Sequence, residues 1–351
     1  MIRTDLTQLL RIEHPVLSAG MARVAQADLV VAVSEAGGMG CLGGVSFMPA
    51  ALQAEIKGIK DRTTKPYAVN LLLPESLTTS DEATWAPVRE LWEQMNPAQR
   101  TKLAGVEALL TPGAVKDQVD VVLAECPPVV VLTFATPKWF IEAARQRGIT
   151  IGAMVGSIGA AQRAAESGAD FLVAQGTEGG GHTGYIATMA LTPAVVDAVS
   201  IPVAAAGGIT DGRGLAASLS LGAGGVWVGS RFIATPEAYG HGAFKQRVVA
   251  GHSRDTILTK SYTGKPLRAF RNEWTTRWES QVDSIKNFPA QYAVAAERVE
   301  TGYQDGDLDE GMMPIGQGVE NIHEITPAGD IVRSMVNTAE RVITSLRASI
   351  A

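Results

Sequence analysis

The feature that most constrains the fold of this chain is a repeated pairing of a short apolar segment with an amphipathic one. The apolar segments do not alternate with polar residues, which is typical of parallel strands buried on both faces. In the first unit a helix-like segment at 27–36 is ended by Gly37 and Gly38. The strands that we expect are 15–19, 39–42, 67–72, 129–133, 150–155, 171–174, 202–206 and 225–228. The helices that we expect are 27–36, 49–60, 114–125, 137–147, 158–167, 193–199, 212–221 and 331–346.

Eight strand–helix units favour a closed (β/α)8 TIM barrel, an α/β fold, over an open sheet. Such a barrel takes roughly 250 residues, and this chain has 351. One barrel with additions therefore fits better than two equal domains. We expect the barrel at 1–230, with an insertion at 74–103 after the third strand. Residues 231–351 are expected to form a mostly helical C-terminal segment that completes the barrel and lies over its mouth or side.

Composition and charge exclude several classes of protein. The formal net charge is −6 and no stripe of Lys and Arg is present, so nucleic acid is not expected as a partner. The apolar runs are far shorter than the roughly 20 residues that cross a bilayer, and the first residues lack the apolar core of a signal peptide. Cys41 and Cys126 give no disulfide framework and no metal cluster. We expect a cytoplasmic protein with no metal, no membrane association and two buried, inert thiols.

Two glycine loops predict a phosphate site. In a barrel, phosphate commonly binds between the loops that follow the last two strands. Here these loops contain Gly207-Gly208 and Gly229-Ser230. Glycine lets backbone N–H groups approach an anion closely, and the next helix opens at 211–213 with an N-terminus that favours negative charge. The alternative is that these are plain barrel turns.

A second glycine pattern, at 38–43 (GMGCLG), matches the dinucleotide-binding sequence G-x-G-x-x-G. That motif must follow a strand and open a helix. This one follows a helix and runs through a strand, so it does not predict a dinucleotide site.

The loop after the sixth strand is the most unusual segment, because 179–182 reads Gly-Gly-Gly-His. Consecutive glycines cost backbone entropy and permit close approach to a bound group. They also place one imidazole, His182, at the rim of the barrel mouth, where it could move or hold a proton. The alternative is a histidine that only bonds a neighbouring loop. His14, His241, His252 and His323 have no partners at metal-ligand spacing.

With these motifs the chain resembles the nitronate monooxygenase family, formerly called 2-nitropropane dioxygenases. It is also similar to that family's relatives, the flavin-dependent enoyl-ACP reductases and NADH:quinone reductases. The resemblance covers nearly the whole chain and is weakest in the insertion at 74–103 and at 231–310. The matching stretches are 13–21, 36–40, 69–71, 175–184, 205–214, 229–232, 306–311 and 315–317.

The resemblance implies an FMN cofactor, a catalytic or substrate-orienting His182, and a C-terminal segment that contacts the flavin. One departure concerns the end of the fifth strand, where some relatives have a lysine near the flavin and this chain has Met154. A positive charge there would stabilise the reduced flavin. The residues implied to contact FMN are Ala19, Gly20 and Met21 by the ring, Asn70, Gln175 and Gln317 elsewhere, and Gly180, Gly181, Gly207, Gly208, Gly229 and Ser230 around the phosphate.

Three functions follow from these observations. The first is nitronate monooxygenation, in which O2 converts an alkyl nitronate into a carbonyl compound and nitrite. The second is an NAD(P)H-dependent reductase of quinones or enoyl thioesters. The third is a flavin-free barrel that binds a phosphate ligand. The sequence names neither the physiological substrate nor an oligomeric state.

Overall fold

The computed structural model describes residues 2–350 except 74–85, 87, 91–92 and 98–111. Most of the insertion expected at 74–103 therefore lies outside the described residues.

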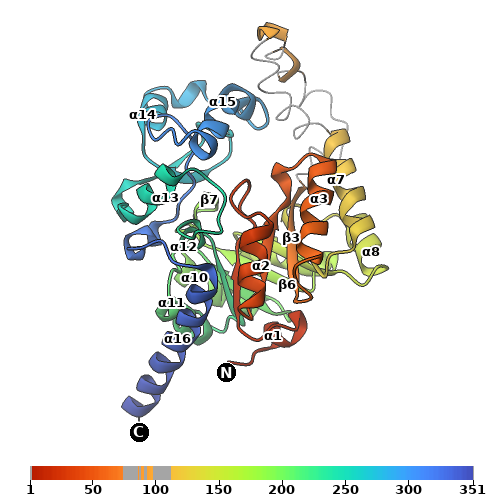
Figure 1. Ribbon diagram of the computed structural model, residues 1–351, viewed down its shortest axis with the longest axis vertical. Helices are drawn as coiled ribbons and strands as arrows, with labels where there is room; N and C mark the ends of the chain where they lie inside the picture. The colour runs from red at the N-terminus through yellow and green to blue at the C-terminus, as the bar shows by residue number, and fades with distance from the viewer. Residues whose placement is uncertain (1, 74–85, 87, 91–92, 98–111, 351) are drawn as a thin grey trace.

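Eight parallel strands form a barrel, which confirms the predicted fold class (Figure 1). Their order is β1-β9-β8-β6-β5-β4-β3-β2. A parallel bridge between Leu17 and Met39 joins the two ends of this sheet. The strands are β1 (Val16–Ser18), β2 (Gly40–Gly43), β3 (Tyr67–Leu73), β4 (Val129–Phe134), β5 (Thr150–Val155), β6 (Phe171–Gln175), β8 (Val203–Ala206) and β9 (Gly225–Val228).

Side chains fill the barrel interior, as in other barrels of this size. Leu17, Phe171 and Trp227 from the strands form one buried cluster, with Leu6 and Leu10 of α1 (Asp5–Leu10) at its end. Leu6 lies against the start of β9, at the amino ends of the strands. Helix α1 therefore closes the bottom of the barrel and leaves the carboxyl ends as the open face.

Helices surround the sheet, and the last helix of the chain takes the eighth place in the ring. Helix α16 (Ala328–Ile350) packs against α11 and α2, which lie on either side of the gap left after β9 (Figure 1). The other ring helices are α2 (Ala27–Glu35), α3 (Pro49–Lys60), α7 (Pro112–Glu125), α8 (Lys138–Arg145), α9 (Ile158–Ser167), α10 (Thr188–Ala198) and α11 (Gly212–Ser220). The division of the chain at residue 230 stays a prediction.

Helix α10 begins at Thr188, five residues before the expected start at Pro193. Proline is typical of the first turn of a helix, which is why the sequence suggested that start. In the structure the carboxylate of Glu178 accepts hydrogen bonds from Thr188 N and Thr188 Oγ1, both at 2.7 Å. The residue that holds the helix start is thus ten positions away, where no local capping pattern reveals it.

The chain between β9 and α16 forms a cap at the carboxyl ends of the strands, beside β7 (Gly181–His182; Figure 1). Its helices are α12 (Ser230–Ile233), α13 (Gly242–Val249), α14 (Glu273–Glu279) and α15 (Ala290–Gln304). It also contains an antiparallel hairpin of β10 (Thr256–Thr259) and β11 (Leu267–Phe270), which the expectation of a mostly helical segment did not include. Strand β11 pairs with β7 as well, so the cap is built directly onto the glycine loop of the barrel.

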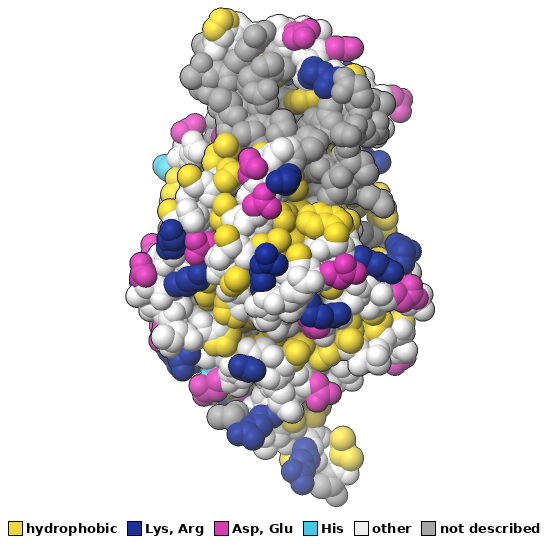
Figure 2. Space-filling model, turned by 90° about the vertical axis from the view of Figure 1, so that its right-hand side faces the viewer, with side chains coloured by type: hydrophobic (Ala, Val, Ile, Leu, Met, Phe, Trp, Pro, Cys, Tyr) yellow, Lys and Arg dark blue, Asp and Glu magenta, His cyan; other side chains and the backbone are white. Residues whose placement is uncertain are grey.

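The outer surface carries charges of both signs. On the side that bears α7 and α8, Lys and Arg side chains alternate with Asp and Glu and form no single-sign stripe (Figure 2). Within the part of the chain that the structure describes, no helix is long and apolar enough to span a membrane. Cys41 is buried as expected, whereas Cys126 is exposed because it lies just beyond the end of α7, outside the packed core.

Candidate functional site

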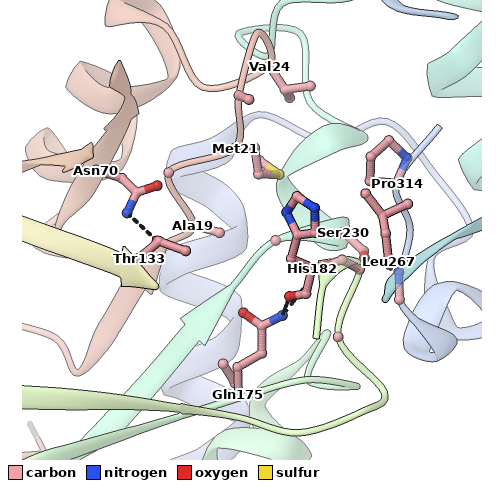
Figure 3. Close-up of a pocket in the computed structure, with 18 of the residues that line it drawn as sticks. Ala19, Met21, Val24, Asn70, Thr133, Gln175, His182, Ser230, Leu267 and Pro314 are labelled. Carbon is pink, nitrogen blue, oxygen red and sulfur yellow. Dashed lines mark hydrogen bonds between the residues drawn. The ribbon is translucent and has the colours of Figure 1, made fainter. Parts of the chain in front are cut away.

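A cavity opens at the carboxyl ends of the strands, between the barrel and the cap (Figure 3). Loops after β1, β6, β8 and β9 form its floor, together with side chains of β3, β4 and β5, and the turn before β11 and helix α15 contribute from the cap. All the cofactor-contacting residues named from the sequence line it, apart from Gln317, and so does His182. They are Ala19, Gly20, Met21, Asn70, Gln175, Gly180, Gly181, Gly207, Gly208, Gly229 and Ser230.

Glycine is required, for two different reasons, at the end of the cavity where the sequence predicts a phosphate site. Gly207 and Gly208 have φ of 109° and 71°, in the left-handed region that side chains rarely adopt. Gly180 instead allows a close approach, because a Cβ there would lie 2.7 Å from the carbonyl carbon of Ile315. On the same side, Gly316 N donates to Ser230 Oγ at 2.9 Å. Backbone from three separate loops therefore converges on one point.

Two sequence expectations at this end need correction or restatement. The N-terminus of α11 is occupied by its own residue, since Asp211 accepts a hydrogen bond from Arg213 N at 2.8 Å and pairs with the Arg213 guanidinium. It therefore offers no free anion site. Gln317 does not line the cavity, although its neighbours Gly316 and Gly318 do. Its backbone N–H instead donates to Glu178 O at 2.8 Å and ties the cap to the glycine loop.

His182 is positioned by the pairing of β7 with β11, in which it stands opposite Leu267. Gln175, at the end of β6, donates its amide Nε2 to His182 O at 2.7 Å and so holds the loop from the barrel side (Figure 3). The imidazole Nε2 lies 2.9 Å from Thr263 Oγ1 in the cap turn. The ring also packs edge-on against Phe134, with centroids 5.2 Å apart. Barrel and cap together fix this side chain.

The surroundings of His182 favour the neutral imidazole. Burial and, second, the positive charge of Lys265 lower the pKa of His182 from 6.5 to about 4. At neutral pH the ring therefore carries one proton and acts as a hydrogen-bonding group without charge. The low pKa makes the ring a poor general base, because an efficient general base has a pKa near the working pH.

A chain of polar groups crosses the floor of the cavity opposite His182. Asn70 Nδ2 donates to Val131 O at 2.8 Å and to Thr133 Oγ1 at 3.0 Å (Figure 3). Thr133 Oγ1 in turn lies 3.3 Å from Met154 Sδ. The amide hydrogens of Asn70 are thus used within the protein, and its carbonyl oxygen remains to accept a hydrogen bond from a ligand.

The cavity lining is short of negative charge. No Asp or Glu is among the described residues that line it. Its one arginine, Arg23, donates through Nε to Glu300 Oε2 at 2.8 Å, and that ion pair joins the loop after β1 to helix α15 of the cap. The electrostatic balance suits an anionic ligand.

Sequence reasoning missed the cap side of the site. Thr263, Phe288, Tyr292 and Tyr303 line the cavity from segments that carry no motif. Thr133 could have been found, because it ends a barrel strand at the face where barrel sites lie.

Over most of its length the chain is similar to known enzymes. The family model described as nitronate monooxygenase matches residues 3–338. A protein of Staphylococcus saprophyticus, described as a probable nitronate monooxygenase, is 34% identical over 308 residues, which are 83% of this chain and 84% of that protein.

Two solved structures share the whole fold. FabK from Thermotoga maritima is 31% identical, with a TM-score of 0.83, and the match covers 99% of this chain and 100% of that one. The nitroalkane oxidase of Streptomyces ansochromogenes is 27% identical with the same TM-score of 0.83, covering 98% of this chain and 100% of that one.

A pH titration of the flavin-free chain, followed by NMR of the imidazole resonances, should place the pKa of His182 near 4. Because this value lies below the 6.5 of the unfolded chain, the unfolded state takes up the proton first as pH falls. The free energy of unfolding should therefore decrease as pH falls from about 6.5 to about 4, and less so in His182→Asn. A measured pKa at or above 6.5 would contradict this description of the site.

Proposed function

The chain belongs to the nitronate monooxygenase family, which makes it a flavin-dependent oxidoreductase, and we propose that it binds FMN and oxidises alkyl nitronates with O2. The observation that carries the proposal is that a single glycine cradle and the neutral His182 line the same cavity. A nitronate is an anion, and no Asp or Glu among the described lining residues would repel it.

The residues present fit FMN. One phosphate would lie among the backbone N–H groups of Gly180, Gly181, Gly208 and Gly229, with the Ser230 hydroxyl as a further donor. The cap would complete the cradle through Gly316. The ring would lie over Ala19 and Met21, with the free carbonyl oxygen of Asn70 as an acceptor for a ring N–H.

His182 would orient the substrate. With a pKa of about 4 it removes a carbon-bound proton poorly, so the substrate would arrive as the nitronate already. The N–H of the neutral imidazole would then donate a hydrogen bond to a nitronate oxygen, in a position that Thr263 and Gln175 hold. When bound, the flavin would supply the electron acceptor, and O2 would provide the carbonyl oxygen, so that two nitronates and one O2 give two carbonyl compounds and two nitrite ions.

The apolar part of the lining would limit water around the reacting atoms. Met21, Leu72, Leu267 and Phe288 line the same cavity as the glycine cradle and His182. Exclusion of water strengthens the hydrogen bonds that orient the nitronate.

An NAD(P)H-dependent reductase is the second candidate. The observation in its favour is that FabK matches this chain as well as the nitroalkane oxidase does, with the same TM-score of 0.83. Met154, whose uncharged side chain lines the cavity where the resemblance implied a lysine in some relatives, does not separate the two candidates. A flavin reduced by either substrate would gain no stabilising charge from that position.

Replacing Ser230 by Ala should weaken FMN binding about 10- to 100-fold, because a hydrogen bond to a charged group contributes about 1.5–3 kcal/mol. The dissociation constant is measured by flavin fluorescence as FMN is added back to stripped protein. Ser220→Ala, on α11 with its Oγ bonded to Ala216 O, is the control and should leave it unchanged. Equal affinity in Ser230→Ala and wild type would remove Ser230 from the phosphate site.

Replacing His182 by Asn should leave the flavin content unchanged and lower kcat/KM for nitrite release from propionate 3-nitronate by about 100-fold, the cost of a misplaced reactant. His323→Asn, at an exposed position of the cap, controls for the loss of a histidine as such. Wild-type turnover in His182→Asn would reduce His182 to a purely structural role.

A further inference from the structure

Lys265, on the turn between β10 and β11, places a positive charge beside residues that line the cavity, although its own side chain is not among them. Its Nζ lies 4.2 Å from the ring centroid of Phe134 and 5.6 Å from that of Phe288. Both distances are within the roughly 6 Å reach of a cation–π attraction. Phe288 lines the cavity, and Phe134 packs against the ring of His182. Two aromatic rings thus hold the ammonium beside the imidazole.

The charge of Lys265 is not neutralised within the described part of the chain. Lys265 forms no ion pair there, whereas Arg23, the cation that lines the cavity, is paired with Glu300. An ammonium that is partly removed from water without a counter-ion is unfavourable. Burial accordingly lowers the pKa of Lys265. A ligand that brought negative charge to this point would offset the cost.

The turn that carries Lys265 is also rigidly joined to the site. Thr263 Oγ1 accepts a hydrogen bond from Lys265 N at 3.3 Å and lies 2.9 Å from His182 Nε2. Two residues on, Leu267 pairs with His182 through the backbone. The ammonium therefore has a defined place relative to the imidazole.

We propose that Lys265 forms an anion subsite beside His182, which selects substrates that enter the cavity as planar oxyanions, either nitronates or carboxylates. The neutral imidazole supplies a hydrogen bond, and the ammonium supplies the charge that the imidazole lacks. A neutral ligand of the same shape gains nothing from the ammonium. The reacting species named here rests on the proposed function, but the subsite itself can be tested without turnover.

The test compares benzoate with neutral benzamide as ligands of the holoenzyme, followed by the shift of the visible flavin band. Lys265→Met should weaken benzoate binding about tenfold, or about 1.4 kcal/mol, and leave benzamide binding within about twofold. Lys265→Arg should bind benzoate almost as wild type does. Lys57→Met, which removes the same charge from the exposed surface of α3, is the matched control and should change neither affinity. Equal benzoate affinity in Lys265→Met and wild type, or an equal loss for benzamide, would overturn the proposal.

Turnover of propionate 3-nitronate separates this proposal from the proposed function. Lys265→Met should raise KM about tenfold with kcat nearly unchanged, as expected for the loss of uniform binding. If wild type turns over no nitronate but the charge-dependent benzoate result holds, the proposed function fails and the anion subsite stands. If nitronate is oxidised with the same KM in both proteins and benzoate affinity is unchanged, the subsite fails alone.

Discussion

The site depends on one backbone pairing, between β7 in the barrel and β11 in the cap. Three consecutive glycines, Gly179 to Gly181, would not hold one conformation by themselves. Strand β11 pairs with the last of them, Gly181, and with His182, and Arg268 of β11 also donates to Thr177 O at 2.8 Å, at the beginning of the loop. Through this pairing the glycine loop, the imidazole of His182 and the cap turn become parts of one rigid unit.

The electrostatics of the site follow from what this unit brings together. The cradle offers backbone N–H groups, the described lining contributes no carboxylate, and the aromatic-held Lys265 stands beside a neutral His182. Together these groups favour a ligand that carries negative charge. This is the physical reason to prefer a substrate that arrives as an anion over one that His182 must deprotonate.

Much of the barrel could be predicted from the sequence, because parallel strands buried on both faces and the helices that cover them leave strong periodic patterns. The glycine turns could be predicted as well, since Gly207 and Gly208 adopt a backbone conformation that few other residues tolerate. The start of α10 could not be predicted, because the carboxylate that caps it, Glu178, lies ten residues earlier, on the other side of β7. Thr263 and Lys265 could not be found either, since a cap turn acquires its role only when the hairpin docks on β7. At Asp211 the sequence correctly indicated the start of a helix but wrongly suggested an anion site there. The Asp211 carboxylate itself accepts the hydrogen bond from Arg213 N.

Anaerobic mixing of the purified holoenzyme with propionate 3-nitronate, and separately with NADH or NADPH, tests the central claim most directly. The visible flavin band reports reduction before oxygen takes any part. Because a neutral His182 and the charge of Lys265 would favour an anionic substrate, we expect the nitronate to bleach this band and the nicotinamide cofactors not to do so. Bleaching by NADH or NADPH alone would contradict the account and assign the chain to the reductases.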